Sequence, residues 1–313
     1  MSVFVAEELS EVLNTKVVIG RINMGLLNRI IIDDVLLDDQ SGQEMLKVTR
    51  LSAKFDIMPF FKGKISISSV QLFGFNINLR KETPDSPPNF KFVLDAFASK
   101  DTVKKENSLD LRINSILIRR GRMSYHVLSE EETPGKFNAK HIQLQNIIAN
   151  ISLKALSKDS LNLGIKRLSL DEKASGFSLK KMSLKLVANN KQTNIDNFTI
   201  ELPETSLKLD TIHLEYDSLK AFDRFTEQVH FSFRTLPSQV TLKDISPFVP
   251  ILSHFKEPVT LDMEVKGTVD QLTCSHLEIT ADDRQFRLRG DVSLQDLSRP
   301  QDAYVYGLSL IHI

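Results

Sequence analysis

One short pattern of apolar residues returns along the chain: apolar-x-apolar-x-x-apolar-x-apolar. Three copies are Ile65-x-Ile67-x-x-Val70-x-Leu72, Leu111-x-Ile113-x-x-Ile116-x-Ile118 and Leu207-x-Leu209-x-x-Ile212-x-Leu214. Alternation with a period of two places the apolar side chains on one face of a β-strand and the polar side chains on the other. The doubled x moves the phase by one residue, so it predicts a bulge, bend or turn there. The spacing between copies is irregular, which favours a mostly-β, repeat-like chain over a strict solenoid.

Helical segments are few and short. Val5, Leu9 and Val12 fall at helical spacing, which predicts an amphipathic helix over residues 1–15 before the period-two pattern begins at Lys16. Prolines at 84, 87 and 88 predict a loop, and the charged stretch 99–108 predicts a linker. We therefore expect a first β unit over residues 16–98 and a second β stretch over 109–307.

Turns and smaller helices are predicted from local composition. Gly74 and Gly121 lie where hairpins would turn, and Gln40-Ser41-Gly42 is typical of a hairpin tip. Phe90, Val93, Leu94 and Phe97 predict an amphipathic turn after the proline loop. Asp244 or Ser246 could cap a short helix with Pro247 at its first position.

Charge and motifs argue against several classes of function. Forty basic and forty acidic residues give a net charge of zero, which disfavours a nucleic-acid binder. The chain contains no phosphate-binding loop, nucleophile elbow or dinucleotide fingerprint. Cys274 is alone, and the seven histidines share no ligand spacing; His141 and His213 are expected to face water from strands. We expect no catalytic, cofactor-binding or metal-binding residues, and the chain is not predicted to be an enzyme.

Paired acids form a weak candidate for a cation site. Asp33-Asp34 and Asp38-Asp39 flank three apolar residues, but a calcium loop needs alternating oxygen ligands and a glycine at its turn. We therefore interpret these acids as solvated strand ends.

The apolar faces leave two architectures open. Two such faces could bury each other in a β-sandwich, or one long sheet could keep its apolar face open as a groove. Periodicity alone does not separate these two arrangements.

The order of segments from Glu8 to Phe97 resembles the N-terminal part of TamB proteins, which belong to the AsmA-like superfamily, and in particular of Bacteroidota-type members. The matching segments are Leu13–Ile22, Asn28–Asp38, Leu51–Phe55, Gly63–Leu72, Asn89–Phe97 and, later, Ile245–Pro250 with Gly267 and Gly290. The middle of the chain, from about Ser124 to Thr241, shares only the general strand pattern and no specific segment.

The resemblance implies a fold and a function. The fold would be an elongated, twisted antiparallel β-sheet groove built from AsmA/TamB-like repeats, with a few peripheral helices. The protein would be anchored in the inner membrane of a bacterial envelope by an upstream helix, would face the periplasm, and would conduct phospholipids by their acyl chains. A C-terminal domain beyond this sequence would meet an Omp85-type barrel in the outer membrane. The alternative role is a scaffold that assists the insertion and secretion of outer-membrane β-barrel proteins.

The candidate groove-lining residues are apolar strand positions, and we expect the phase shifts to turn some of them outward. They are Ile65, Ile67, Val70, Leu72, Ile113, Ile116, Ile118, Leu207, Leu209, Ile212 and Leu214. Residues 308–313 match the translation of a common sequencing-adaptor end, so we leave them out of the fold prediction.

Overall fold

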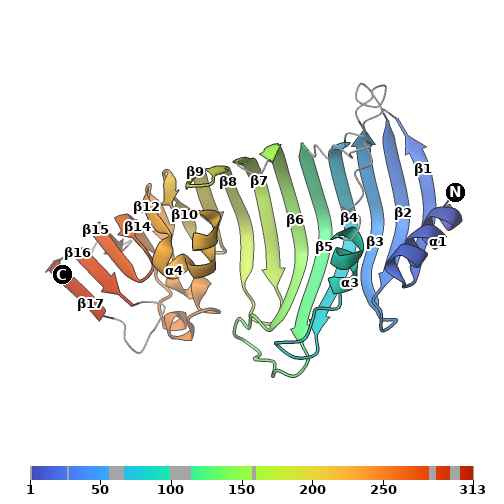
Figure 1. Ribbon diagram of the computed structural model, residues 1–313. Helices are drawn as coiled ribbons and strands as arrows, with labels where there is room; N and C mark the ends of the chain where they lie inside the picture. The colour runs from blue at the N-terminus through green and yellow to red at the C-terminus, as the bar shows by residue number, and fades with distance from the viewer. Residues whose placement is uncertain are drawn as a thin grey trace. The chain divides into compact units, whose positions relative to one another are not determined.

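β-Strands dominate the chain in the computed structural model, with 61% of the residues in strands and 14% in helices. The mainly β fold class is thereby confirmed (Figure 1). The structure describes residues 2–26, 28–55, 67–98, 114–156, 160–281, 287–296 and 304–312. The chain divides into two compact units: unit 1 is Met1–Ser152 with Ser169–Phe177, and unit 2 is Leu153–Leu168 with Ser178–Ile313.

The described residues of unit 1 form two helices and the strands of one twisted sheet. Its elements are α1 (Ser2–Leu13), β1 (Val17–Gly25), β2 (Arg29–Asp38), β3 (Glu44–Phe55), β4 (Ile67–Lys81), α3 (Lys91–Ala98), β5 (Ser115–Val127), most of β6 (His141–Leu156) and the end of β7 (Ser160–Glu172). β1 to β6 pair in chain order. The predicted first helix is confirmed as α1.

One strand pair differs from the antiparallel arrangement that we expected. β4 and β5 are parallel, with Val70 opposite Ile116 and Leu79 opposite Tyr125. Parallel neighbours need a long connection that carries the chain back to the same end of the sheet, and the connection here contains α3. The predicted linker, 99–108, lies outside the described residues. Because β4 and β5 pair on either side of it, the linker does not separate the two compact units.

Phase shifts with a left-handed residue occur inside strands, at positions other than the doubled x of the three copies named above. A residue with positive φ occupies the second x of the doubled x in six strands: Asp34, Gly74, Arg120, Asn146, Asn197 and His276. A single left-handed residue turns the strand so that the next apolar side chain returns to the original face. At these positions the bulge keeps the apolar residues of a strand on one face. The doubled x at residues 68–69, 114–115 and 210–211, where we expected lining residues to turn outward, contains no residue with positive φ.

The two glycines predicted to lie at hairpin turns lie instead within strands. Gly74 is in the middle of β4 with a φ of 65°, where it forms the bulge. Gly121 is in the middle of β5, and a Cβ atom there would collide with the ring of Phe75. Close packing and bulge geometry, rather than chain reversal, explain both glycines. The hairpin tip at residues 40–42 is confirmed, with Gly42 at a φ of 79°.

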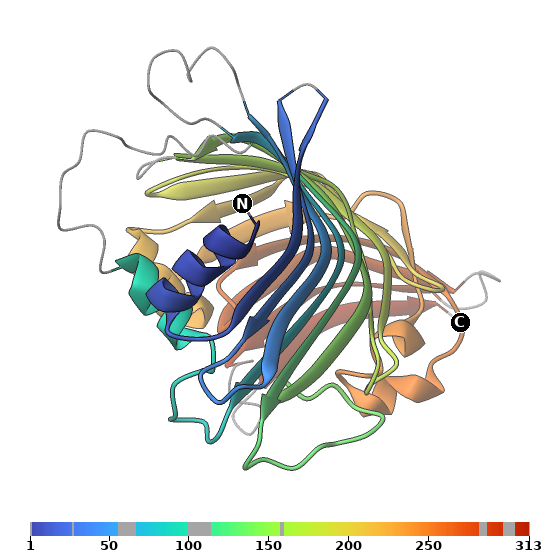
Figure 2. The same cartoon turned by 90° about the vertical axis from the view of Figure 1, so that its right-hand side faces the viewer.

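α1 and α3 cover one end of the sheet in unit 1 (Figure 2). Ala6 and Leu13 of α1 are buried with Val17 and Ile19 of β1, and with Leu37 and Met45. Phe90 and Val93 pack against this cluster, as the amphipathic turn predicts, whereas Leu94 is 58% exposed. The side chain of Phe97 lies outside the described part of the structure.

Unit 2 continues the β pattern with shorter strands, and every described pairing in it is antiparallel. Its strands after β7 are β8 (Ser178–Asn189), β9 (Gln192–Glu201), β10 (Ser206–Lys208), β11 (Ile212–Glu215), β12 (His230–Arg234), β13 (Ser238–Val240), β14 (Val259–Gly267), β15 (Gln271–Ala281), β16 (Arg287–Gln295) and β17 (Tyr304–His312). β17 includes residues 308–312, which pair with β16.

The helical segments of unit 2 are short: η2 (Leu219–Arg224), α4 (Phe225–Gln228), η3 (Leu242–Ile245) and η4 (Pro250–His254). The helix predicted to start at Pro247 is absent, since two 3₁₀ segments flank that residue instead. Pro250 has no backbone N–H and cannot continue an α-helix begun at Pro247, which explains the break.

Candidate functional site

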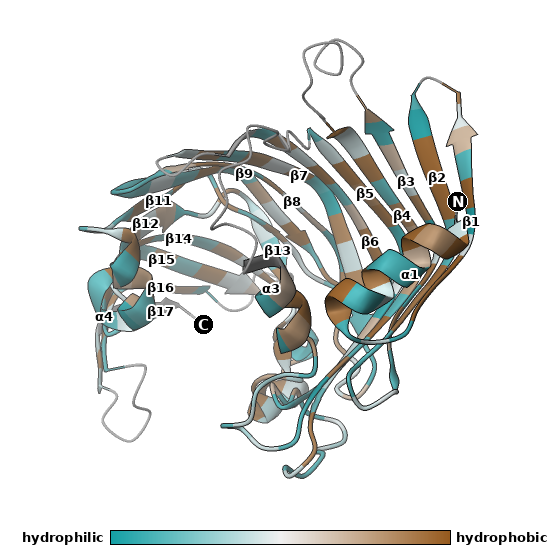
Figure 3. Cartoon of the chain, turned by 45° about the vertical axis from the view of Figure 1, so that its right-hand side comes forward, coloured by the Kyte–Doolittle hydropathy of each residue, from teal (hydrophilic) through white to brown (hydrophobic). Residues whose placement is uncertain are grey.

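The strands of unit 1 carry a continuous row of apolar side chains on one face. Residues directly opposite each other on neighbouring strands lie on the same face. Leu51 on β3 is opposite Leu72 on β4, and Leu72 is opposite Ile118 on β5. Two residues further along the same strands, Ala53 is opposite Val70 and Val70 is opposite Ile116. Ile116 is in turn opposite Ile151 on β6. We call this side of β3 to β6 the apolar face; apolar segments recur along these strands in Figure 3.

Five of the predicted lining residues lie on the apolar face. Val70, Leu72, Ile116 and Ile118 form its centre, and Ile67 joins them through its pairing with Phe55. All five are half-buried. Ile65 and Ile113 lie outside the described residues.

The packing around the apolar face comes from the sheet itself. The buried residues Val48, Phe75 and Ile147 pack against nine half-buried hydrophobic side chains, and each of these belongs to a strand between β2 and β7. In the cluster under α1 and α3, by contrast, helices supply part of the packing. Within the described part of unit 1, the side chains at the centre of the apolar face therefore pack against side chains of neighbouring strands in the same sheet. No second layer covers them there.

The other four predicted lining residues lie in unit 2. Leu207 pairs with Ile200 and Ile212 pairs with Ile195, so these two share one face with β9, and both are half-buried. Leu214 packs against the buried cluster of Tyr216, Ala221 and Val229, to which η2 contributes Ala221. Leu209 is only 7% exposed, which suits a core position better than a lining position.

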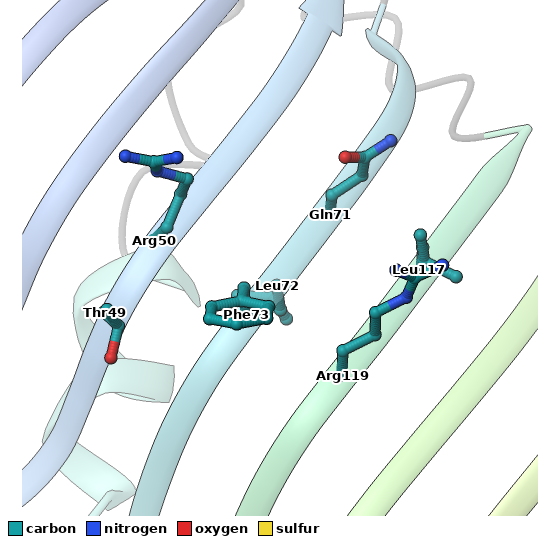
Figure 4. A pocket seen from close by; sticks show the side chains of 7 residues that line it. All are labelled: Thr49, Arg50, Gln71, Leu72, Phe73, Leu117 and Arg119. Atoms are coloured by element: carbon teal, nitrogen blue, oxygen red, sulfur yellow. The ribbon is translucent and has the colours of Figure 1, made fainter.

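The polar side of unit 1 contains a shallow open depression of about 620 Å³ (Figure 4). Thr49 and Arg50 lie on one side of Phe73 and Arg119 lies on the other. Arg50 donates a hydrogen bond of 2.6 Å to Asp33; this bond lowers the pKa of Asp33 and raises the pKa of Arg50. The lining combines the hydroxyl group of Thr49, the amide of Gln71 and two guanidinium groups with apolar side chains.

Two of the paired acids, Asp38 and Asp39, are buried, which corrects their interpretation as solvated strand ends. The carboxylate of Asp39 is only 2% exposed and accepts hydrogen bonds from Arg80 at 2.7 Å and Asn89 at 3.2 Å. Burial raises the pKa of Asp39, but hydrogen bonds from Ser41, Asn89 and the backbone at Gln43 and Ser41 outweigh it, so the pKa is lowered. Asp39 therefore fastens the hairpin tip to the segment before α3. Both of its carboxylate oxygens already accept hydrogen bonds from the protein.

Histidine and glutamate side chains meet at the other end of the same polar side. His126, Glu132 and His141 have possible ligand atoms within 4.8 Å of one another, although the sequence predicted no metal-binding residues. His141 is 7% exposed, so the expectation that it faces water is wrong. Fifteen positions separate the two histidines, a spacing that matches no ligand motif; only the register of β5 against β6 could have revealed the pair.

No protein-family model matches this chain, and no significant match is found among curated proteins. Among the described residues, none of the helices combines the length and the apolar character needed to cross a membrane.

Proposed function

We propose that this chain binds the acyl chains of phospholipids along the apolar face and is part of a TamB-like conduit that moves phospholipids between envelope membranes. The observation that carries the proposal is the centre of the apolar face, where Val70, Leu72, Ile116 and Ile118 lie side by side and half-buried, with no second layer over them among the described residues. A contiguous apolar patch that stays partly exposed marks an interaction site.

The chemistry of such a conduit requires no catalytic residue. Moving one methylene group from an apolar contact into water costs about 0.8 kcal/mol. An acyl chain that slides from Leu72 to Ile118 exchanges one apolar contact for another, so little of that cost arises at each step. The charged headgroup stays in water beyond the edge of the strands. We accordingly propose a transport role rather than an enzymatic one.

The cellular setting is part of the same proposal and rests on the resemblance to TamB proteins. The full protein would be anchored in the inner membrane, would face the periplasm, and would meet an Omp85-type barrel at the outer membrane. None of these partners is needed for the apolar face to bind lipid, so the binding step can be tested on this chain alone.

A second candidate function is assistance to outer-membrane barrel proteins, and the pairing of β1 favours it. Among the described strands, β1 pairs only with β2, which leaves its other edge available to a strand of a client protein. Proline substitutions in β1 would remove backbone donors and would block such pairing, whereas they would leave lipid on the apolar face.

Two neighbouring residues of β5 give a matched test of lipid binding. Ile118 lies on the apolar face, and Leu117 lies on the opposite side, where it lines the polar depression. We expect Ile118→Lys to reduce the phospholipid that co-purifies with the chain, and Leu117→Lys to leave it unchanged, as measured by native mass spectrometry. Circular dichroism checks that both variants fold. Equal lipid content in two folded variants would contradict the proposal.

A further inference from the structure

The end of β5 and the start of β6 bring two histidine rings together, with their centroids 5.3 Å apart and their planes inclined by 52°. His126 and His141 are direct partners in the antiparallel register, and their Nδ1 atoms lie 3.0 Å apart. Glu132, from the connection between the two strands, places its Oε1 atom 4.0 Å from Nδ1 of His126. Three groups that are common metal ligands therefore converge from three points of one hairpin.

The hydrogen bonds of His141 fix which of its ring nitrogens is free. Nε2 of His141 lies 2.9 Å from the backbone carbonyl oxygen of Glu130. A carbonyl oxygen only accepts hydrogen bonds, so Nε2 carries the hydrogen and Nδ1 of the neutral ring has a lone pair. That lone pair is directed toward His126. A metal-bound histidine commonly donates its other ring N–H to a backbone carbonyl in this way.

A positive charge between these groups would satisfy all three of them. A hydrogen on Nδ1 of His126 can form a hydrogen bond to Nδ1 of His141. Oε1 of Glu132, 4.0 Å from Nδ1 of His126, is then too far away to accept that hydrogen as well. A divalent cation can contact both nitrogens and the carboxylate at once. Two ligands about 2.0–2.1 Å from a tetrahedral zinc ion lie roughly 3.3 Å apart. The observed separation of 3.0 Å is within a small side-chain adjustment of that value.

We propose that His126, His141 and Glu132 form a Zn²⁺ site that fastens the connection between β5 and β6. Two imidazoles and one carboxylate are a donor set that zinc accepts, with a fourth position left for water. His141 is buried, His126 is half-buried and Glu132 is exposed, so an ion can enter from the side of Glu132. The site lies on the opposite side of the sheet from the apolar face, and it does not depend on lipid binding.

Zinc binding by the whole chain tests the site directly. The untagged chain is treated with a chelator, dialysed and titrated with zinc sulfate by isothermal calorimetry. We expect one Zn²⁺ per chain, and an unfolding temperature that rises with the concentration of free zinc because the ion binds the folded state. We expect His126→Ala and Glu132→Gln each to weaken the affinity by at least about tenfold.

An exposed histidine–glutamate pair elsewhere provides the control. His213 and Glu215 lie 3.0 Å apart on β11, and no third ligand is grouped with them among the described residues. His213→Ala should leave zinc affinity unchanged. Glu132 is exposed, so Glu132→Gln is expected to fold and keeps the test valid even if a histidine variant does not. Absence of zinc binding in the parent chain, or equal affinity in Glu132→Gln and the parent, would overturn the proposal.

Discussion

At the scale of single residues, the left-handed positions determine which side chains reach the apolar face. Asn and Asp adopt positive φ more readily than other residues, and glycine does so without steric cost. The doubled x predicts where a strand must change phase, but it does not say whether the chain turns back or bulges. Gly74 illustrates the ambiguity, because a glycine is equally suited to a hairpin turn and to a bulge inside a strand.

Replacement of Gly74 tests the bulge. A Cβ atom there would lie 2.7 Å from Oγ1 of Thr49, and the φ of 65° is unfavourable for any side chain. We expect Gly74→Ala to lower the free energy of unfolding by about 2 kcal/mol. Gly42→Ala is the control, since it also has a positive φ but meets nothing within 4 Å. Urea denaturation should show a clearly smaller loss for Gly42→Ala; equal losses would mean that packing against Thr49 contributes nothing.

The buried carboxylate of Asp39 predicts a dependence on pH. Its pKa is lowered in the folded chain, so its contribution to stability is fully present above its ordinary value of 3.8 and is lost as the pH falls through the folded value. We expect Asp39→Asn to lower the free energy of unfolding by about 2 kcal/mol at pH 7, because the hydrogen bond to Arg80 loses its charged acceptor. We also expect the free energy of unfolding to fall less steeply in acid than it does in the parent chain.

The exposed pair Lys91–Asp95 supplies the comparison for Asp39. Asp95→Asn should cost no more than about 0.5 kcal/mol at any pH. Chemical denaturation between pH 3 and pH 7 measures both variants. An acid transition that is the same in Asp39→Asn as in the parent would show that Asp39 does not contribute to it.

At the scale of helices and strands, local patterns predicted more than long-range ones. Period-two alternation predicted the strands, and helical spacing predicted α1. The parallel pairing of β4 with β5 depends on the path taken by the chain between them, which no local pattern specifies. The His126–His141 pair likewise depends on the register of two strands. Leu209 resembles its neighbours in sequence, and only the packing around it shows that it is buried.

The open apolar face predicts unequal costs for the same substitution. Leu13 is buried beneath packed neighbours in the α1 cluster, whereas Leu72 is half-buried on the apolar face. We expect Leu13→Ala to lower the free energy of unfolding by about 3 kcal/mol and Leu72→Ala by about 1 kcal/mol. Guanidinium denaturation measures both. A loss near 3 kcal/mol for Leu72→Ala would indicate a covered core, as in a β-sandwich.

At the scale of the whole molecule, a mainly β chain with an apolar face fits one proposed role. Each unit has strands with one apolar side, and bulges keep those sides in phase. Among the described residues of unit 1, the helices cover one end of the sheet, and the centre of the apolar face is packed by strands. Lipid acyl chains have the chemistry to occupy that centre.

Photo-crosslinking along β4 and β5 tests whether lipid occupies the apolar face. A photoreactive side chain is placed, one position at a time, at Leu72, Ile116 and Ile118 on the apolar face, and at Gln71, Leu117 and Arg119 on the polar side. The chain is produced in bacteria with labelled phospholipid and irradiated. We expect lipid adducts at the three positions on the apolar face and none at the three positions on the polar side. Adducts without alternation, or no adducts at Leu72, Ile116 and Ile118, would contradict this expectation.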